Sequence, residues 1–225
     1  MKRRYKLALI IITGCLITFF INSVVPKNKI TLVAIGDSFS AALTPSGVVG
    51  TSFTDYTKEY LENKKLLDSY NYDYSYDHLL LTDLNDFLDN NTLRNGLAIK
   101  QLIAQADIIT IAIGIDELAD ISLRKNIDNE VINNYITEYE TILKQIRAFY
   151  KKKIIVAGLY PVYNVTKNDI VDLNKKMSVM CGKYDALFID ILPFAINSEY
   201  YFKPDSYYLN YKIHKKISEI IVKYI

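Results

Sequence analysis

The sequence has no tryptophan, and cysteine and histidine occur only twice each. The two cysteines, Cys15 and Cys181, are too few for a disulfide framework, and Cys15 lies inside an apolar N-terminal run, so we expect no structural disulfide. A charge excess is missing as well, since 27 basic residues are matched by 25 acidic ones and the net charge is +2. Because such a balance offers no basic surface, we expect no nucleic-acid partner.

Motifs for cofactors and metal ions are also missing. The stretch "GDSFSAALTPSG", residues 36–47, lacks a Gly-x-Gly spacing, which disfavours a phosphate or nucleotide site. The run Asp37, Ser38, Phe39, Ser40 does not have the alternating D-x-S-x-S spacing of a metal-binding loop. We therefore expect no cofactor and no metal ion.

The N-terminus is the first strong feature that is present. Residues 1–6, "MKRRYK", are basic, and the next 19 residues, 7–25, carry no charge. A helix of that length is about 28 Å long, close to the thickness of the hydrocarbon core of a bilayer. The basic flank predicts a cytoplasmic end and places the rest of the chain outside the cytoplasm. We expect a single-pass anchor in the cell membrane, followed by a short linker at residues 26–29.

Two other interpretations of the N-terminal segment stay open. "ITGC", residues 12–15, fits a loose lipoprotein-processing pattern with Cys15 as the lipid acceptor, although the apolar run continues beyond it. A cleaved secretory signal is the other alternative, but the apolar segment is long and no small-x-small cleavage site follows it. All three interpretations place the domain outside the cytoplasm.

Residues 30–225 alternate apolar runs with helical periodicity and predict one domain. We expect strands at residues 31–35, 70–76, 108–113, 154–159 and 186–189. The clearest helical stripe runs from residue 127 to residue 149, and a last helix begins near Leu209. Apolar strands separated by helices predict a parallel sheet that is covered on both faces. The expected fold is a three-layer α/β/α domain with a flavodoxin-like, five-stranded parallel sheet.

Functional groups of such sheets gather in the loops beyond the carboxyl ends of the strands. Five stretches occupy those positions or precede the last helix: "GDS" (36–38), "YDH" (76–78), "GIDE" (114–117), "YPVYN" (160–164) and "KPDSYYLN" (203–210). This ordered set resembles the SGNH, or GDSL-type, hydrolases, a family of esterases and lipases. The resemblance spans roughly residues 30–225 and implies serine-dependent hydrolysis of carboxylic esters, such as O-acyl groups on lipids or glycans.

The resemblance assigns Ser38 as the nucleophile, at the head of a helix whose dipole would favour a developing anion. A helix-capping role for Ser38 or Asp37 is compatible with the same sequence. Gly114 matches the glycine of the family's third block. Asp116 stands where the family has an asparagine that donates to the oxyanion, so an acceptor replaces a donor. The second-block region, "YSYDHLLLTDL", has no glycine to supply a further oxyanion donor.

The family's catalytic acid and base belong to a D-x-x-H block. Here the block is Asp205, Ser206, Tyr207, Tyr208, so the acid is present and Tyr208 takes the place of the histidine. A phenol, with an ordinary pKa of about 10, cannot accept the serine proton at neutral pH as imidazole does. His78, in the loop after the second strand, is an alternative base, although an exposed loop histidine is the simpler interpretation. We expect His214 at the surface or boundary of the last helix.

Two classes of function follow from these substitutions. One is a membrane-anchored, extracytoplasmic ester hydrolase with weakened or lost catalysis, acting on a small ester, a lipid or a cell-envelope glycan. The other is a non-catalytic binding or scaffold module that keeps the hydrolase fold and its pocket.

Overall fold

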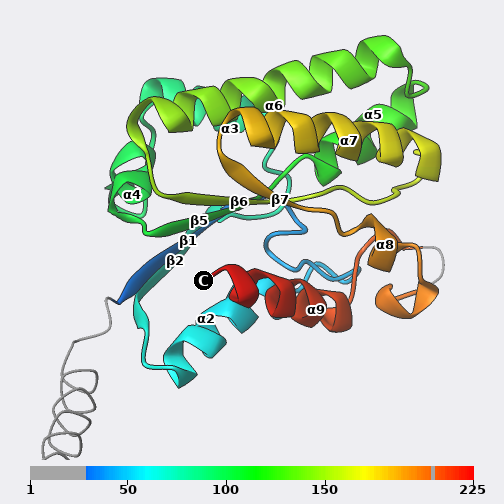
Figure 1. The fold of residues 1–225 in the computed structure, drawn as a ribbon. Helices are drawn as coiled ribbons and strands as arrows, with labels where there is room; N and C mark the ends of the chain where they lie inside the picture. The colour runs from blue at the N-terminus through cyan, green and yellow to red at the C-terminus, as the bar shows by residue number, and fades with distance from the viewer. Residues whose placement is uncertain (1–28, 204–205) are drawn as a thin grey trace, which may run out of the picture.

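The computed structural model describes residues 29–203 and 206–225 (Figure 1). Its centre is a parallel sheet of five strands in the order β2-β1-β5-β6-β7, which is the flavodoxin-like order that the sequence predicts. The strands are β1 (Ile30–Gly36), β2 (Leu67–Ser75), β5 (Ile108–Ala112), β6 (Lys153–Ala157) and β7 (Ala186–Ile189). A separate two-stranded ladder pairs β3 (Leu93–Arg94) with β4 (Leu97–Ala98).

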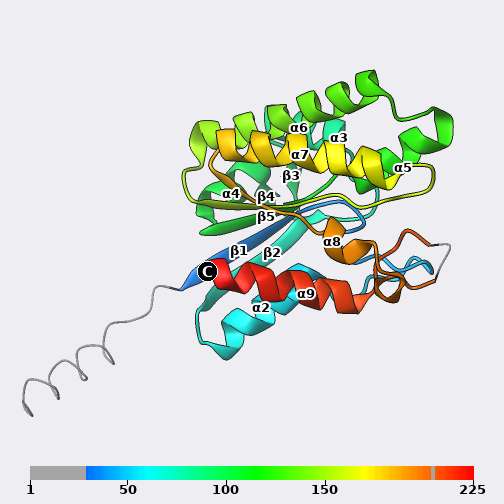
Figure 2. The same cartoon turned by 45° about the vertical axis from the view of Figure 1, so that its right-hand side comes forward.

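Helices cover both faces of the five-stranded sheet, which confirms the three-layer prediction. Figures 1 and 2 show α3, α6 and α7 together on one face and α2 and α9 together on the other. The helices are α2 (Phe53–Asn63), α3 (Leu81–Asn90), α4 (Ile99–Gln105), α5 (Ile115–Arg124), α6 (Asn129–Phe149), α7 (Lys167–Lys183), α8 (Leu192–Ala195) and α9 (Tyr211–Ile221), with short 3₁₀ turns at Ser198–Tyr200 and Val222–Tyr224.

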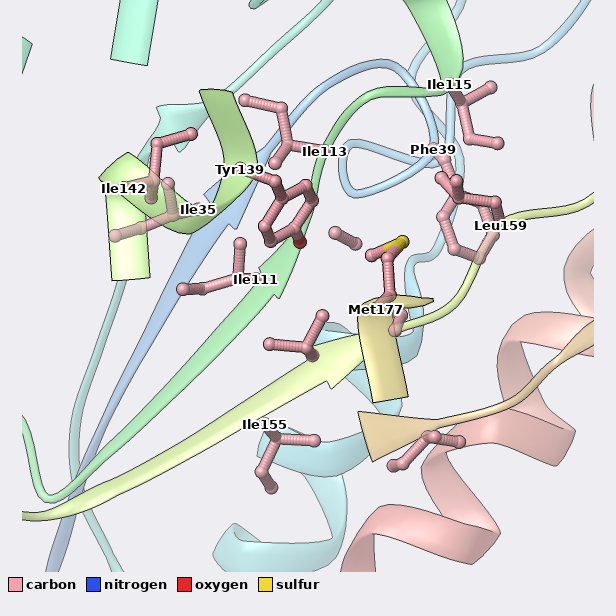
Figure 3. Close-up of a cluster of buried hydrophobic side chains, with 14 of the residues drawn as sticks. Ile35, Phe39, Ile111, Ile113, Ile115, Tyr139, Ile142, Ile155, Leu159 and Met177 are labelled. Carbon is pink, nitrogen blue, oxygen red and sulfur yellow. The ribbon is translucent and has the colours of Figure 1, made fainter. Parts of the chain in front are cut away.

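The core lies between the sheet and these helices. Every residue of β5 is buried, as expected for a central strand that is covered on both sides. Figure 3 shows Tyr139 of α6 among Ile35 of β1, Ile111 of β5 and Met177 of α7. These contacts come from the apolar stripe of α6, and the helix begins where the Asp128 side chain accepts a hydrogen bond from the Val131 N–H.

Strand register brings three loops to one place. Gly36, the last residue of β1, pairs with Ser75 of β2 and with Ala112 of β5. A Cβ at position 36 would lie 1.8 Å from the Ala112 carbonyl oxygen, so only glycine permits this approach. The loops that contain "GDS", "YDH" and "GIDE" therefore leave the sheet side by side.

The predicted membrane segment, residues 7–25, lies outside the described residues. Within residues 29–203 and 206–225, no helix has the length and apolar character needed to cross a membrane.

Candidate active site

Ser38 lies in a series of turns and not at the head of a helix, so the sequence prediction is wrong on this point. Residues 37–42 are turns and bends, and the next described helix begins only at Phe53. The Ala41 N–H donates to the Asp37 carbonyl, but Ala42 has a φ of +53°, which ends the turn. No helix therefore begins at Ser38 itself.

Asp37 anchors the Ser38 turn to the first turn of α5. One of its carboxylate oxygens accepts backbone N–H bonds from Gly114, Ile115 and Asp116 at 2.8, 2.7 and 3.3 Å, and the other accepts from the Phe39 N–H at 3.0 Å. The side chain is fully buried. Burial and the neighbouring Asp116 carboxylate raise the pKa of Asp37, while the donated N–H bonds oppose that rise. Asp37 thus caps α5, a helix 77 residues away in sequence from its own turn.

Asp116 and Ser38 are in direct contact. The Ser38 hydroxyl donates to Asp116 Oδ1 at 2.5 Å, and the Ser38 N–H donates to Asp116 Oδ2 at 3.0 Å. The His78 N–H donates to the same Oδ2, also at 3.0 Å. Ser38 is 2% exposed and Asp116 is 4% exposed, so the pair is buried. The three described partners of the carboxylate are all hydrogen-bond donors.

His78 contributes its backbone to this cluster, whereas its ring points elsewhere. Its φ is +61°, a left-handed conformation that glycine adopts most easily and that histidine adopts more often than most residues. The ring is largely exposed, and Nε2 lies 3.5 Å from the Asp120 carboxylate. The loop therefore supplies a backbone donor even though it has no glycine.

Gly114 is required where β5 leads into α5. Its φ is +106°, and a Cβ at this position would lie 1.8 Å from the Tyr135 hydroxyl. Without a side chain at position 114, the backbone turns sharply enough for Asp37 to reach the first N–H groups of α5. Gly114 therefore contributes to the site by letting the chain turn so that α5 can place Asp116.

Tyr208 belongs to an aromatic cluster with Tyr207 and Tyr163. The rings of Tyr207 and Tyr208 stack with centroids 4.3 Å apart, and the Tyr207 hydroxyl donates to that of Tyr208 at 3.1 Å. Burial raises the pKa of Tyr207, and the charge of Asp116 adds to that rise. The cluster borders a pocket of about 250 Å³ that is lined by Pro45, Tyr163, Lys203, Ser206, Tyr207 and Tyr208. Asp205 lies outside the described residues.

His214 is buried and not at the surface, which corrects the expectation from sequence. Its ring is 2% exposed and stacks on Phe39 and Phe53, at centroid distances of 5.1 and 6.2 Å. Its Nδ1 has no hydrogen-bond partner among the described residues. Burial lowers the pKa of His214 to about 4, with a small opposing effect from Asp55. His214 fills space beneath the Ser38 turn.

A larger cavity adjoins the same turn. It measures about 650 Å³, and its wall includes Ser40 and Ala41 from the Ser38 turn and Tyr70 and Tyr72 from β2. Ser75, Tyr76 and Asp77, which come just before His78, belong to the same wall, as do Asp55 and Lys58. This volume falls in the range of small-molecule binding sites.

Sequence reasoning identified the loops of this site but missed two of its features. It did not assign Asp37 to α5, because a carboxylate next to a serine suggests a local cap. It also did not identify the His78 N–H, because the only signal is a backbone angle. Ser38 and Asp116 belong to two of the loops that the sequence places at the carboxyl ends of strands, and they share a hydrogen bond.

Comparison with solved structures shows the same fold in several hydrolases. A lipase, Lip_vut3, from a goat rumen metagenome has a TM-score of 0.70 and 19% identity, over 87% of this chain and 97% of that one. A lipase/acylhydrolase from Enterococcus faecalis has a TM-score of 0.64 and 17% identity, over 87% of this chain and 94% of that one. An acetylxylan esterase from Geobacillus stearothermophilus has a TM-score of 0.62 and 14% identity, over 87% of this chain and 94% of that one.

Sequence comparison gives two further results. No curated protein matches the chain. The family described as GDSL-like Lipase/Acylhydrolase matches residues 32–217. Because that match covers most of the domain, the chain belongs to the GDSL-like lipase/acylhydrolase family, as the sequence motifs predict.

Proposed function

We propose that this protein is a membrane-anchored, extracytoplasmic member of the family in which serine-dependent ester hydrolysis is weakened or lost. The contact between Ser38 and Asp116 carries the proposal. A carboxylate that accepts the serine hydroxyl and two backbone N–H groups occupies the position where the family places an oxyanion donor. The nucleophile is in its family position, but its surroundings do not favour a negative transition state.

An ionised Asp116 would carry a large electrostatic cost. An ionised carboxylate about 4 Å from a developing oxyanion is repelled by roughly 4 kcal/mol at an effective dielectric constant of about 20. Since each 1.36 kcal/mol changes a rate tenfold, this repulsion alone corresponds to about a thousandfold loss. The same carboxylate accepts a hydrogen bond from the Ser38 hydroxyl, with 2.5 Å between Oγ and Oδ1.

The missing base supports the same conclusion. Tyr208 stands in the histidine position, and a phenol is a poor general base at neutral pH. Of the two histidines, His78 turns its ring toward Asp120, and His214 is buried against Phe39 with a lowered pKa. Neither ring has a described hydrogen bond to Ser38.

The proposed location rests on the basic residues 1–6 and the uncharged residues 7–25. A domain held at the outer surface of the membrane would meet lipid, glycan and small esters, and O-acyl groups of these compounds are the substrate class that we propose. The named activities of the structural relatives, lipase and acetylxylan esterase, fit that class.

A binding or scaffold function is the second candidate. The cavity of about 650 Å³ next to the Ser38 turn favours it, because the cavity combines tyrosine rings with Asp55, Asp77 and Lys58. Such a wall could hold a polar ligand without any turnover at Ser38.

Reactivity of Ser38 with a fluorophosphonate probe distinguishes the two candidates. The wild type, Ser38→Ala and a matched control, Ser40→Ala, are incubated with the probe and the labelled residue is mapped by mass spectrometry. Slow labelling that disappears in Ser38→Ala alone supports a weakened hydrolase. No labelling of a protein with a cooperative unfolding transition supports the binding module, and fast labelling at wild-type Ser38 contradicts the proposed attenuation.

A further inference from the structure

We propose that the Ser38 and His78 N–H groups form an anion-binding site that the chain fills with its own Asp116 carboxylate. Asp116 would then act as a built-in ligand that closes the site in the resting protein. Removing that side chain should open the site to a small external carboxylate such as formate or acetate.

The convergence of donors is the first observation. Ser38 and His78 come from different loops, yet their N–H groups point at one oxygen atom, Asp116 Oδ2, at 3.0 Å each. The Ser38 hydroxyl reaches the other oxygen of the same carboxylate. Three donors thus surround one carboxylate, as in sites that bind an external carboxylate.

The burial of the contact is the second observation. Ser38 and Asp116 are nearly inaccessible, so the Ser38 N–H must find an acceptor inside the protein. Asp37 cannot replace Asp116, because its two oxygens already accept N–H groups from Phe39 and from the first turn of α5. Without the Asp116 carboxylate, the buried Ser38 N–H and the part-buried His78 N–H would lose their described acceptor.

The fixed positions of the donors are the third observation. Gly36 aligns the ends of β1, β2 and β5, and Asp37 ties the Ser38 turn to α5. His78 is held in a left-handed conformation that aims its N–H at the site. Because these constraints do not involve the Asp116 side chain, the donors should stay in place when that side chain is shortened.

This site is the one on which the proposed function rests, but the two can fail independently. The proposed function concerns turnover at Ser38, whereas the anion site is measured by ligand binding and unfolding. A protein without any esterase activity can still bind formate in this way.

The test uses thermal unfolding of the full-length chain in detergent, with sodium formate titrated against sodium chloride at constant ionic strength. Asp116→Ala should have a lower Tm than the wild type, and formate should raise that Tm in a saturable manner, by about 2 °C or more. The wild type should show no saturable response, because its site is filled. Asp116→Asn, which keeps a side chain in the site, should respond much less than Asp116→Ala.

Glu117→Ala is the matched control. Glu117 also lies in the first turn of α5 and its carboxylate accepts one backbone N–H, from Leu81. This variant loses a carboxylate without opening a site of two converging donors, so formate should not stabilise it. If Asp116→Ala gives no cooperative transition, Asp116→Ser, which leaves a polar group in the first turn of α5, is measured in the same way.

Two outcomes would overturn the proposal. One is a folded Asp116→Ala or Asp116→Ser protein whose Tm does not respond to formate beyond the wild type. The other is an equal response in Glu117→Ala, which would show a general effect of formate on the fold. Failure of both Asp116 variants to fold even in saturating formate would also contradict it, because the external anion would not have replaced the side chain.

Discussion

His78 makes its described contribution to the site through its backbone, and this leads to a prediction at the scale of one residue. A non-glycine residue in the left-handed region costs about 1–2 kcal/mol, which glycine avoids at some entropic cost in the unfolded chain. We expect His78→Gly to keep the Tm within about 2 °C of the wild type or to raise it. His78→Val should lower the Tm by about 2–4 °C or more, because a β-branched residue resists this conformation.

The comparison of these two variants by thermal unfolding separates the backbone from the ring. Asp120→Ala is the control, since it removes the carboxylate that lies 3.5 Å from the ring of His78. If His78→Gly and Asp120→Ala both lose as much stability as His78→Val, the ring and not the backbone conformation would be the important feature.

The pH dependence of stability is predicted at the scale of one element, the helix α9. His214 of α9 is buried against Phe39 and Phe53, and its pKa is lowered to about 4. An unfolded histidine has a pKa of about 6.5, so the unfolded state binds more protons between these values and stability falls as the pH falls. The loss should reach about 2 kcal/mol at pH 5 and be absent above about pH 7.

Urea unfolding at pH 7 and pH 5 measures this effect. His214→Phe keeps an aromatic ring between Phe39 and Phe53 but cannot bind a proton. The drop in the free energy of unfolding between the two pH values should be about 2 kcal/mol smaller in this variant than in the wild type. Equal drops in the two proteins would mean that His214 does not limit stability in acid.

Elements were predictable from sequence where an apolar pattern dominates. The strand at residues 186–189 has the predicted bounds, and the stripe of residues 127–149 forms α6 from Asn129 to Phe149. The strand expected at residues 154–159 ends at Ala157, and the Leu159 N–H bonds to the Asn174 side chain of α7 and not to a strand. That apolar run continues as a buried loop, which periodicity cannot distinguish from a strand.

Other features depend on contacts between distant segments and could not be predicted from local pattern. The expected helix at Ser38 does not form, because the chain turns at Ala42 and the Asp37 side chain bonds to α5. His214 was expected at the surface, but the rings of Phe39 and Phe53 cover it. The pairing of Ser38 with Asp116 follows from strand ends that are aligned by register.

At the scale of the whole molecule, the N-terminal segment predicts how the chain is oriented across the membrane, with the domain outside the cytoplasm. In intact cells, external protease should digest the domain while a cytoplasmic marker stays intact, and the undigested chain should remain with the membranes. Cys15→Ser should behave in the same way if residues 7–25 span the membrane. Recovery of the full-length chain in the cytosolic fraction would contradict this orientation. A lipid on Cys15, detected by mass spectrometry, would show a lipid anchor in place of the membrane-spanning one.

The proposed attenuation of catalysis also concerns the whole molecule, because one transition state depends on residues from several loops. Restoring the base and the oxyanion donor together should therefore restore chemistry. Tyr208→His returns an imidazole to the last block, where general-base assistance is worth about 100- to 10,000-fold. Asp116→Asn replaces the carboxylate with a possible donor, and one such donor is worth about 100- to 1,000-fold. The two effects should not be additive.

The central claim is tested most directly by the rate of hydrolysis of a nitrophenyl acetate by the wild type, by Asp116→Asn with Tyr208→His, and by the same double variant with Ser38→Ala. Asp116→Asn with Tyr207→His is the matched control, since it adds an imidazole one position away. We expect the double variant to exceed the wild type by at least about 100-fold and to lose that gain with Ser38→Ala. Brisk, Ser38-dependent turnover by the wild type, or an equal gain from Tyr207→His, would contradict the account.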